Sequence, residues 1–458
     1  MRLVLRLVRF FLVFVVLVLI ACLVWLYVAP PALLRVGSGY AAKIVCSNVF
    51  LAGRESAEVL SEDVQAPGHP LLRLMRVAVD RDAGRVHAAI LGAIAPATAV
   101  YREGFGCTLL ADGKTPASLP TAAASAEAPA KAPVDTKALW PEGETVVTRP
   151  DIGDILSRDD LTGPGLRAVV VVKDDRIVGE RYGQGFDARM PLLGWSMTKT
   201  VNAALIATMI RDGRMTLADK GLFGAWKGDE RADITLAQLL AMESGLAFNE
   251  DYGAVADVTR MLFLEPDMAG FAASLPLART SGTGFHYSSG TAMLLSRLWM
   301  DRFTEKAEAL AYPHKALFEP LGMASAVMEL DETGTFAGSS YMYATARDWA
   351  RFGLLLAKRG EWQGRSILPP HLVEDMWQEN ATSGGRYSRM QTWLARQRTG
   401  EGAFRAVVPQ DQFALEGHDG QSVTVIPSRG LVVVRLGLTP AAKGYRSDAL
   451  AAALLQAL

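Results

Sequence analysis

Ser196 and Lys199 are the residues of this 458-residue chain whose types and spacing best fit covalent catalysis. They stand three positions apart at the start of a predicted helix, so their side chains share one helix face. The helix is otherwise almost wholly apolar as far as Ile210, which is typical of a buried helix, and burial disfavours the charged form of a lysine. A neutral lysine can take the proton of a serine hydroxyl and so make it a nucleophile. No other lysine in the chain has a serine three positions before it.

Two further motifs lie C-terminal to Ser196 and Lys199, and the order of all three indicates a family. A Gly- and Ser-rich stretch at 282–290 contains Tyr287, and the sequence Gly-His-Asp-Gly-Gln at 417–421 precedes a predicted late strand. The order Ser-x-x-Lys, Tyr-x-Ser, His-x-Gly resembles the penicillin-recognising serine hydrolases. This superfamily includes class C β-lactamases, penicillin-binding proteins and related esterases and amidases. The stretch 318–323 is similar to a segment of the class C branch, and 341–353 resembles the 6-aminohexanoate-dimer (nylon-oligomer) hydrolase group.

The resemblance implies a role for each matching residue. Ser196 would be the acylated nucleophile, and Lys199 and Tyr287 would be the proton-transfer pair, with the choice of general base between them left open. The backbone N–H groups of Ser196 and Gln421 would form the oxyanion hole. Tyr252 resembles a tyrosine that contacts the amide substrate in the nylon-oligomer group, although an ordinary residue of the pocket wall would read the same way.

Two departures from the family pattern bear on the substrate. The usual Tyr-x-Asn ends here in Ser289, which removes an amide that holds a substrate side chain. The usual Lys-Thr-Gly is here His418, Asp419 and Gly420, which replaces a fixed cation that would pair with a carboxylate. Ser289, His418, Asp419 and Gly420 are therefore expected to bind substrate, together with Tyr252, and to favour a neutral amide or ester over a penicillin.

Three functions remain in view. The first is a serine hydrolase, an amidase or esterase, acting on a small linear amide or ester. The second is a D-Ala-D-Ala carboxypeptidase or β-lactamase of the cell wall. The third belongs to another class, a catalytically silent module that binds peptides or muropeptides. The presence of Ser196, Lys199 and Tyr287 disfavours it, because a silent descendant usually loses one of them.

The composition of the chain gives no indication of a nucleic-acid or metal partner. The formal net charge is −1 and 21% of residues are charged, so the chain offers no basic surface for nucleic acid. The six histidines are scattered and no Cys or His cluster has metal-ligand spacing, so neither a metal nor another cofactor is expected.

The N-terminus predicts a membrane segment. Arg2, Arg6 and Arg9 precede an unbroken apolar run at 10–29, long enough to cross a bilayer as a helix. We expect an uncleaved, single-pass anchor in the inner (cytoplasmic) membrane, with the remaining chain in the periplasm. A cleaved signal peptide fits less well, since no small-residue cleavage site follows. Lipidation at Cys22, which ends a lipobox-like stretch, is a further alternative.

The chain divides by composition into four parts. Residues 1–30 are the anchor, 31–113 a small strand-rich extracytoplasmic region, 114–138 an Ala/Pro-rich linker and 139–458 the hydrolase domain. Cys46 and Cys107 fall in the second part, where an oxidising compartment would let them form a disulfide.

Strand and helix patterns indicate the fold of the last part. Hairpins are predicted at 167–182 and 422–436, with helical patterns between 196 and 359 and a final helix from 447. Strands at both ends with helices between them favour an α/β (α+β) fold closed by the chain termini, and not a doubly wound parallel sheet. The family resemblance implies the β-lactamase/penicillin-binding-protein fold, an antiparallel sheet flanked by helices plus a helical subdomain.

Overall fold

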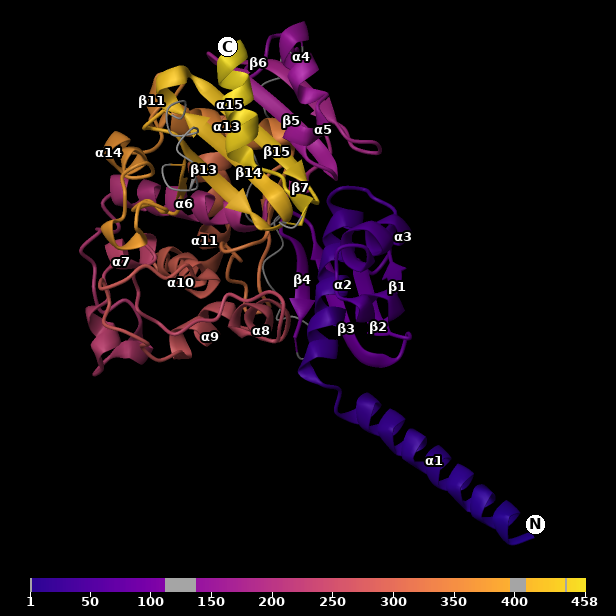
Figure 1. Ribbon diagram of the computed structural model, residues 1–458. Helices are drawn as coiled ribbons and strands as arrows, with labels where there is room; N and C mark the ends of the chain where they lie inside the picture. The colour runs from indigo at the N-terminus through magenta and orange to yellow at the C-terminus, as the bar shows by residue number, and fades with distance from the viewer. Residues whose placement is uncertain (1, 112–136, 396–408, 441–442) are drawn as a thin grey trace.

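The computed structural model describes residues 2–111, 137–395, 409–440 and 443–458. Figure 1 shows a long N-terminal helix that projects from the body, a small unit at its base and a large body of sheet and helices. The predicted linker at 114–138 lies almost wholly outside the described residues.

A six-stranded antiparallel sheet forms the centre of the large body. Its order is β12-β13-β14-β15-β5-β6, so a strand from the start of this part lies beside a strand from its end. Both predicted hairpins are present, β5–β6 and β14–β15. The predicted fold class is thus confirmed. The strands are β5 (Leu166–Lys173), β6 (Arg176–Tyr182), β12 (Trp393–Leu394), β13 (Phe413–Gly417), β14 (Gln421–Ile426) and β15 (Leu431–Gly437).

Helices cover both faces of this sheet. Val170 and Val172 of β5 point into the main core, where α13 (Ala346–Ala357) packs against the sheet. Val169 and Val171 point the other way, toward α4 (Pro150–Leu156) and α15 (Ser447–Ala457). Because neither face meets water, β5 reads as a continuous valine run and not as an alternating pattern.

The helical subdomain lies along the lower side of the sheet in Figure 1. Its central pair is α6 and α10, which pack against each other and carry residues of the candidate site. The helices of the body besides those named above are α5 (Asp159–Thr162), α6 (Thr198–Arg211), α7 (Leu236–Leu240), α8 (Asp257–Phe263), α9 (Met268–Ser274), α10 (Ser289–Met300), α11 (Lys306–Pro313), α12 (Glu319–Leu321) and α14 (Pro370–Glu374). The large body also contains two small sheets, whose strands are β7 (Leu192–Leu193), β8 (Val327–Met328), β9 (Met342–Ala344), β10 (Glu361–Trp362) and β11 (Arg365–Ser366).

The small unit is a four-stranded antiparallel meander with a helix packed across it. Its four strands lie between residues 75 and 110, and its helix α2 was not anticipated from the sequence. Its buried surface includes Ser38, Gly39 and Ser47, so it lacks the apolar stripe that marks a helix in sequence. The elements are α2 (Ala32–Phe50), α3 (Ser56–Val59), β1 (Met75–Asp80), β2 (Arg85–Ile90), β3 (Ile94–Arg102) and β4 (Gly106–Leu110).

A disulfide joins the helix of this unit to its sheet. It links Cys46 of α2 to Cys107 of β4, with Cα atoms 6.0 Å apart. Both residues are fully buried in the same hydrophobic core that runs on into the large body. The small unit therefore shares its core with the large body.

A buried ion pair fastens the two parts together. The Lys43 ammonium of α2 contacts the carboxylate of Glu329 in the large body, and both side chains are almost inaccessible. Glu329 also accepts hydrogen bonds from the Ser47 hydroxyl at 2.8 Å and the Cys107 N–H at 2.6 Å. Since every oxygen of the carboxylate is used, the charge is compensated without water.

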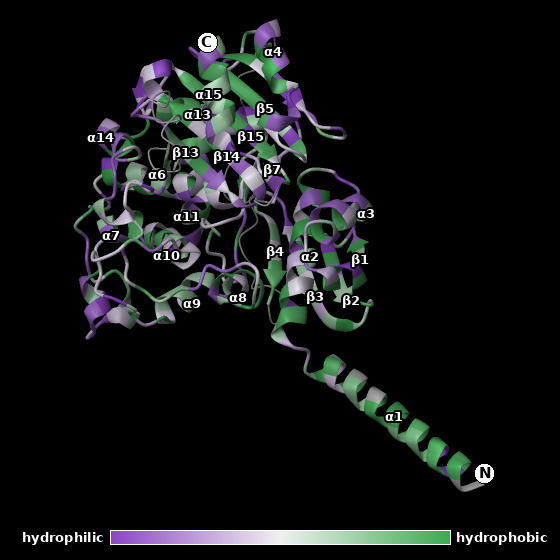
Figure 2. Cartoon of the chain, viewed as in Figure 1, coloured by the Kyte–Doolittle hydropathy of each residue, from purple (hydrophilic) through white to green (hydrophobic). Residues whose placement is uncertain are grey.

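The N-terminal helix α1 (Arg2–Val28) carries three arginines near its start and only apolar residues from Phe10 on, and Figure 2 shows it mostly in the hydrophobic colour. Its stretch Val4–Val28 is long and apolar enough to cross a membrane, and none of it is buried against the body. An anchor and a signal sequence both have these properties.

The ion pair predicts a large loss of stability when one partner is removed. Glu329→Ala would leave the Lys43 ammonium buried and uncompensated, so the free energy of unfolding should fall by about 3–5 kcal/mol. Glu361→Ala, at an exposed glutamate of β10, should change it by less than about 0.5 kcal/mol. Urea unfolding of both variants measures the difference. Equal stability of the two would show that the pair contributes little.

Candidate active site

The turn that carries Ser196 has a constrained backbone. Residues Trp195–Met197 form a single 3-10 turn, and α6 begins directly after it. Trp195 has a φ of 48°, in the left-handed region that bulky residues rarely occupy, and such outliers cluster at functional sites. Its indole is held against Tyr341 and His418, with ring centroids 6.0 and 5.7 Å away. The hydroxyl-bearing residue Ser196 is left partly exposed.

Lys199 lies in the first turn of α6 with its amine aimed at Ser196. Nζ is 3.0 Å from the Ser196 Oγ, 3.0 Å from the Ser289 Oγ and 2.9 Å from the Ser339 carbonyl oxygen. The side chain is 1% exposed. Desolvation lowers the pKa of Lys199 to about 8, against a smaller opposing effect of the Glu250 charge. A substantial neutral fraction near physiological pH is what a general base needs.

Tyr287 lies on the other side of the serine. Its ring centroid is 4.9 Å from the Lys199 amine, and Ser196 is one of the groups that influence the pKa of its phenol. The ring packs in an aromatic cluster with Tyr387 and Trp393, at centroid distances of 5.8 and 5.1 Å. Burial raises the pKa of Tyr287 well above its usual value, so the phenol stays protonated and can donate. The structure thus brings together the three residues singled out as nucleophile and proton-transfer pair.

Ser289 makes contacts that differ from the expectation. It was expected to bind substrate, but its hydroxyl is fully buried, where it accepts from Lys199 and donates to Glu250 at 2.5 Å. Serine is too short to extend past these partners as the usual asparagine would. Its contacts make it a positioning residue for Lys199.

Glu250 is the site residue that sequence reasoning missed. Its carboxylate accepts from both the Ser289 hydroxyl and the Ser289 N–H, the latter at 2.7 Å. In sequence it lies in Asn249-Glu250-Asp251, which reads as a solvated loop. The one available signal was its position two residues before Tyr252, in a segment already linked to the substrate.

Tyr252 and His418 form one wall of the site. Their rings stack at 4.9 Å with an interplanar angle of 24°. The pKa of the Tyr252 phenol is raised by burial and by the Glu250 charge, against smaller opposing effects of Ser289 and Ser340. The His418 side chain is 43% exposed and its Nε2 is 3.6 Å from the Asp419 carboxylate.

The turn at 418–420 is shaped by its backbone. Asp419 and Gly420 both have positive φ, 58° and 84°. A buried arginine, Arg435, supports the turn from behind by donating to the Gly420 carbonyl at 2.8 Å. Burial lowers the pKa of Arg435 to about 10. The guanidinium is occupied with carbonyl oxygens behind the turn, so it does not replace the missing lysine on the substrate side.

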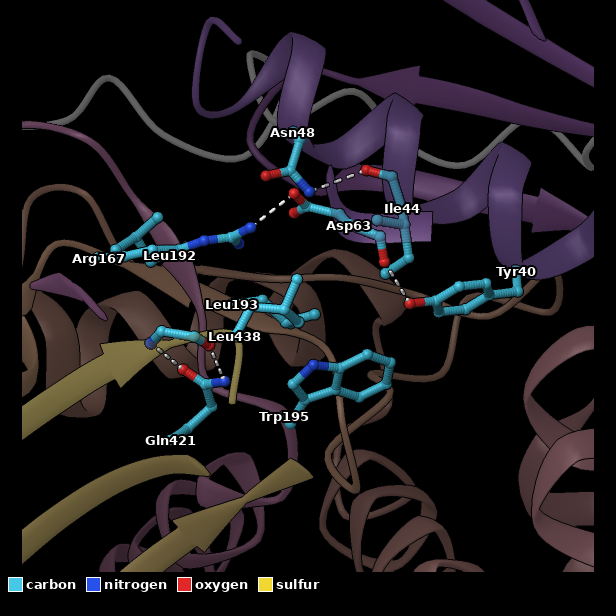
Figure 3. Close-up of a pocket in the computed structure, with 11 residues that line it drawn as sticks. Tyr40, Ile44, Asn48, Asp63, Arg167, Leu192, Leu193, Trp195, Gln421 and Leu438 are labelled. Carbon is cyan, nitrogen blue, oxygen red and sulfur yellow. Dashed lines mark hydrogen bonds and ion pairs between the residues drawn. The ribbon is translucent and has the colours of Figure 1, made fainter. Parts of the chain in front are cut away.

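Gln421 begins β14 directly opposite Gly417. Its side-chain amide is clamped to the backbone, with Oε1 accepting from the Gly437 N–H at 2.9 Å and Nε2 donating to the Gly437 carbonyl. Figure 3 shows this clamp beside Trp195, with Tyr40 and Asp63 of the small unit facing it. The end of β13 lies close to the serine turn. A Cβ atom added at Gly417 would be only 2.2 Å from the Gly194 carbonyl oxygen, so only glycine fits there without a shift.

These groups place a hydroxyl and a desolvated amine within hydrogen-bonding distance of each other and a phenol-bearing ring beside the amine. That set can form and hydrolyse an acyl-enzyme. Within the described residues no group of three or more His, Cys, Asp or Glu side chains is placed to hold a metal ion.

Solved structures of similar fold include three hydrolase-related proteins. A 6-aminohexanoate-dimer hydrolase homologue from Bacillus anthracis is 22% identical, with a TM-score of 0.53, over 64% of this chain and 78% of its own. A penicillin-binding protein homologue from Caulobacter crescentus is 16% identical, with a TM-score of 0.53, over 69% and 99%. EstCE1, a hydrolase with promiscuous acyltransferase activity, is 15% identical, with a TM-score of 0.51, over 67% and 97%. At these identities the likeness is one of fold.

No curated protein matches the chain. The model of the Beta-lactamase family, in contrast, matches residues 159–457, which include both hairpins, the Ser196 turn and the 418–420 turn. Together with the shared fold, this match establishes that the chain belongs to the β-lactamase family of serine hydrolases.

Proposed function

We propose that this protein is a membrane-anchored serine hydrolase that cleaves a neutral linear amide or ester through an acyl-enzyme on Ser196. The observation that carries the proposal is the buried Lys199 amine, 3.0 Å from the Ser196 hydroxyl and with a lowered pKa. Amidase or esterase activity on small substrates fits the family as a whole.

Acylation begins with transfer of the Ser196 proton to the neutral Lys199 amine, directly or with Tyr287 as relay. The Oγ then attacks the carbonyl carbon, and the carbonyl oxygen takes up the electron pair. Collapse of this tetrahedral intermediate breaks the bond to the amine or alcohol, which leaves with the proton held by the pair. Ser196 is now esterified.

Deacylation repeats these steps with water. The pair takes a proton from water, the hydroxide attacks the ester carbon, and Ser196 leaves as a hydroxyl after regaining the proton. The carboxylic acid is released. The backbone N–H groups of Ser196 and Gln421 are our candidates for the oxyanion hole. Gly417, which pairs with Gln421, lies close to the serine turn and supports this assignment.

Neutral substrates are favoured by the turn at 418–420. The position of the family's lysine is held by His418, beside the Asp419 carboxylate, which would repel a substrate carboxylate. The tether is supported by α1, whose residues from Phe10 to Val28 are all apolar and which is not buried against the body. A cell-wall peptidase or β-lactamase, and a silent peptide-binding module, are outcomes that the first experiment below distinguishes.

Ser196→Ala should abolish acylation and turnover without loss of folding, because only one oxygen is removed. Intact mass is measured after exposure to p-nitrophenyl acetate, an aminohexanoate dimer and a penicillin. We expect an adduct from the ester or the amide, and none from the penicillin, on the wild type and on Ser157→Ala, which changes an exposed serine, and no adduct on Ser196→Ala. A stable penicillin adduct would indicate a cell-wall enzyme, and no adduct with any compound a silent module.

The rate should depend on pH through Lys199. Because a general base works only when neutral, kcat/KM for p-nitrophenyl acetate should rise with pH and level off above about 8. Glu250→Gln removes a negative charge that raises this pKa, so the inflection should move to lower pH. Asp251→Asn, an exposed neighbour in the same loop, should leave it in place. A profile without an inflection near pH 8 would contradict the role of Lys199.

Deletion of residues 1–30 should release the protein from membranes and retain esterase activity, since α1 makes little contact with the body. Cell fractionation and activity of the truncated and full-length chains test this. If expression of the full-length gene yields a mature protein whose N-terminus lies after α1, that helix is a signal sequence.

A further inference from the structure

An apolar cavity lies between the small N-terminal unit and the large body. Its volume is about 570 Å³, within the range of small-molecule sites. Leu34 and Val36 of α2 line one side, Leu72 and Ile90 continue it, and Phe263 of α8 faces them. Figure 1 shows α8 beside the part of α2 that is nearest to α1.

The inner end of this cavity is the wall of the candidate active site. Trp195, which directly precedes the nucleophile, lines it together with the stacked rings of Tyr252 and His418. This end of the cavity therefore lies next to the serine turn, and the small unit supplies walls that the hydrolase body alone does not.

The outer end opens where the chain leaves α1. Leu33 and Leu71 line the cavity there and are also 41% and 38% exposed. Leu33 lies in the first turn of α2, directly after the Ala29-Pro30-Pro31 connection from α1. Exposed apolar side chains around an opening mark contact with a lipid or a partner, and here the opening adjoins the helix that would lie in the bilayer.

We propose that this cavity holds the fatty acyl chain of a membrane amphiphile whose amide or ester bond is cleaved at Ser196. This inference rests on the proposed function. The acyl part of a substrate stays attached to Ser196 through both chemical steps, so it is the part that needs a permanent place beside the serine. The lining is mainly apolar, with Tyr40, His69, Thr259, His418 and Asp419 among its polar members, so most of it offers no hydrogen-bond partner to the amide groups of a peptide.

Chain-length selectivity tests the proposal. The full chain is reconstituted in phosphatidylcholine vesicles, and kcat/KM is measured for p-nitrophenyl acetate and p-nitrophenyl decanoate. Each buried methylene is worth roughly fourfold, so the wild type should prefer the decanoate by at least about tenfold. Substrate partitioning into vesicles is the same for every variant, so comparison between variants removes it.

Leu71→Asp and Leu74→Asp form a matched pair. Both leucines lie in the 3-10 turn Pro70–Leu74 with similar exposure, 38% and 41%, but only Leu71 lines the cavity. Leu71→Asp should lower the decanoate-to-acetate ratio by about tenfold or more, and Leu74→Asp should leave it unchanged. Ala254→Trp, at an exposed alanine of the cavity wall, should lower it by bulk and keeps the test valid if Leu71→Asp does not fold.

The outcomes separate the two proposals. An acetate ester cleaved at Ser196 without decanoate preference, or with equal ratios in the Leu71 and Leu74 variants, would overturn the acyl cavity and leave the hydrolase proposal intact. Failure of both esters to acylate Ser196 would overturn both proposals.

Discussion

Removal of the Lys199 amine from water is the constraint around which the active site is arranged. The amine keeps three polar contacts, with Ser196, Ser289 and the Ser339 carbonyl, none of which carries a charge. The nearest carboxylate contact, Glu250, acts through the Ser289 hydroxyl and not directly. A direct ion pair would favour the protonated form of Lys199 and oppose its proposed role as a base, whereas a site without a carboxylate would lack a charge to stabilise the ammonium that this role produces. With the Ser289 hydroxyl between the amine and the carboxylate, the pKa of Lys199 lies between these two extremes.

Local patterns predicted the parts of this site that lie close together in sequence. The spacing of Ser196 and Lys199, the tyrosine motif and the two hairpins all follow from residues within a few positions of one another. The parts that depend on distant pairing were not predictable. Glu250 looks like a solvated loop residue until Ser289 is placed beside it, and α2 looks too polar to be buried until its partners are known. The contacts of Ser289 with Lys199 and Glu250 were not predictable for the same reason, since these neighbours come from distant parts of the chain.

The segment at 339–341 connects the chemistry to the small unit. The Ser339 carbonyl accepts from Lys199, while the ring of Tyr341, two residues on, lies 4.2 Å from the ammonium of Lys43 and 6.0 Å from Trp195. One short stretch thus touches the lysine proposed for catalysis, the lysine of the buried ion pair and the serine turn. The small unit is in this sense part of the active-site scaffold, although the family match begins only at residue 159.

The ion pair between Lys43 and Glu329 spans 286 positions of the chain. During synthesis the small unit emerges first, and its buried lysine has no counter-charge until Glu329 has been made. At ordinary elongation rates this interval is roughly 15 to 60 s. The first unit to leave the ribosome must therefore wait in an incomplete state, with α2 still hydrated along the face that later joins the body. Biogenesis of this protein is a long-range assembly in which its N-terminal part is made first and completed late.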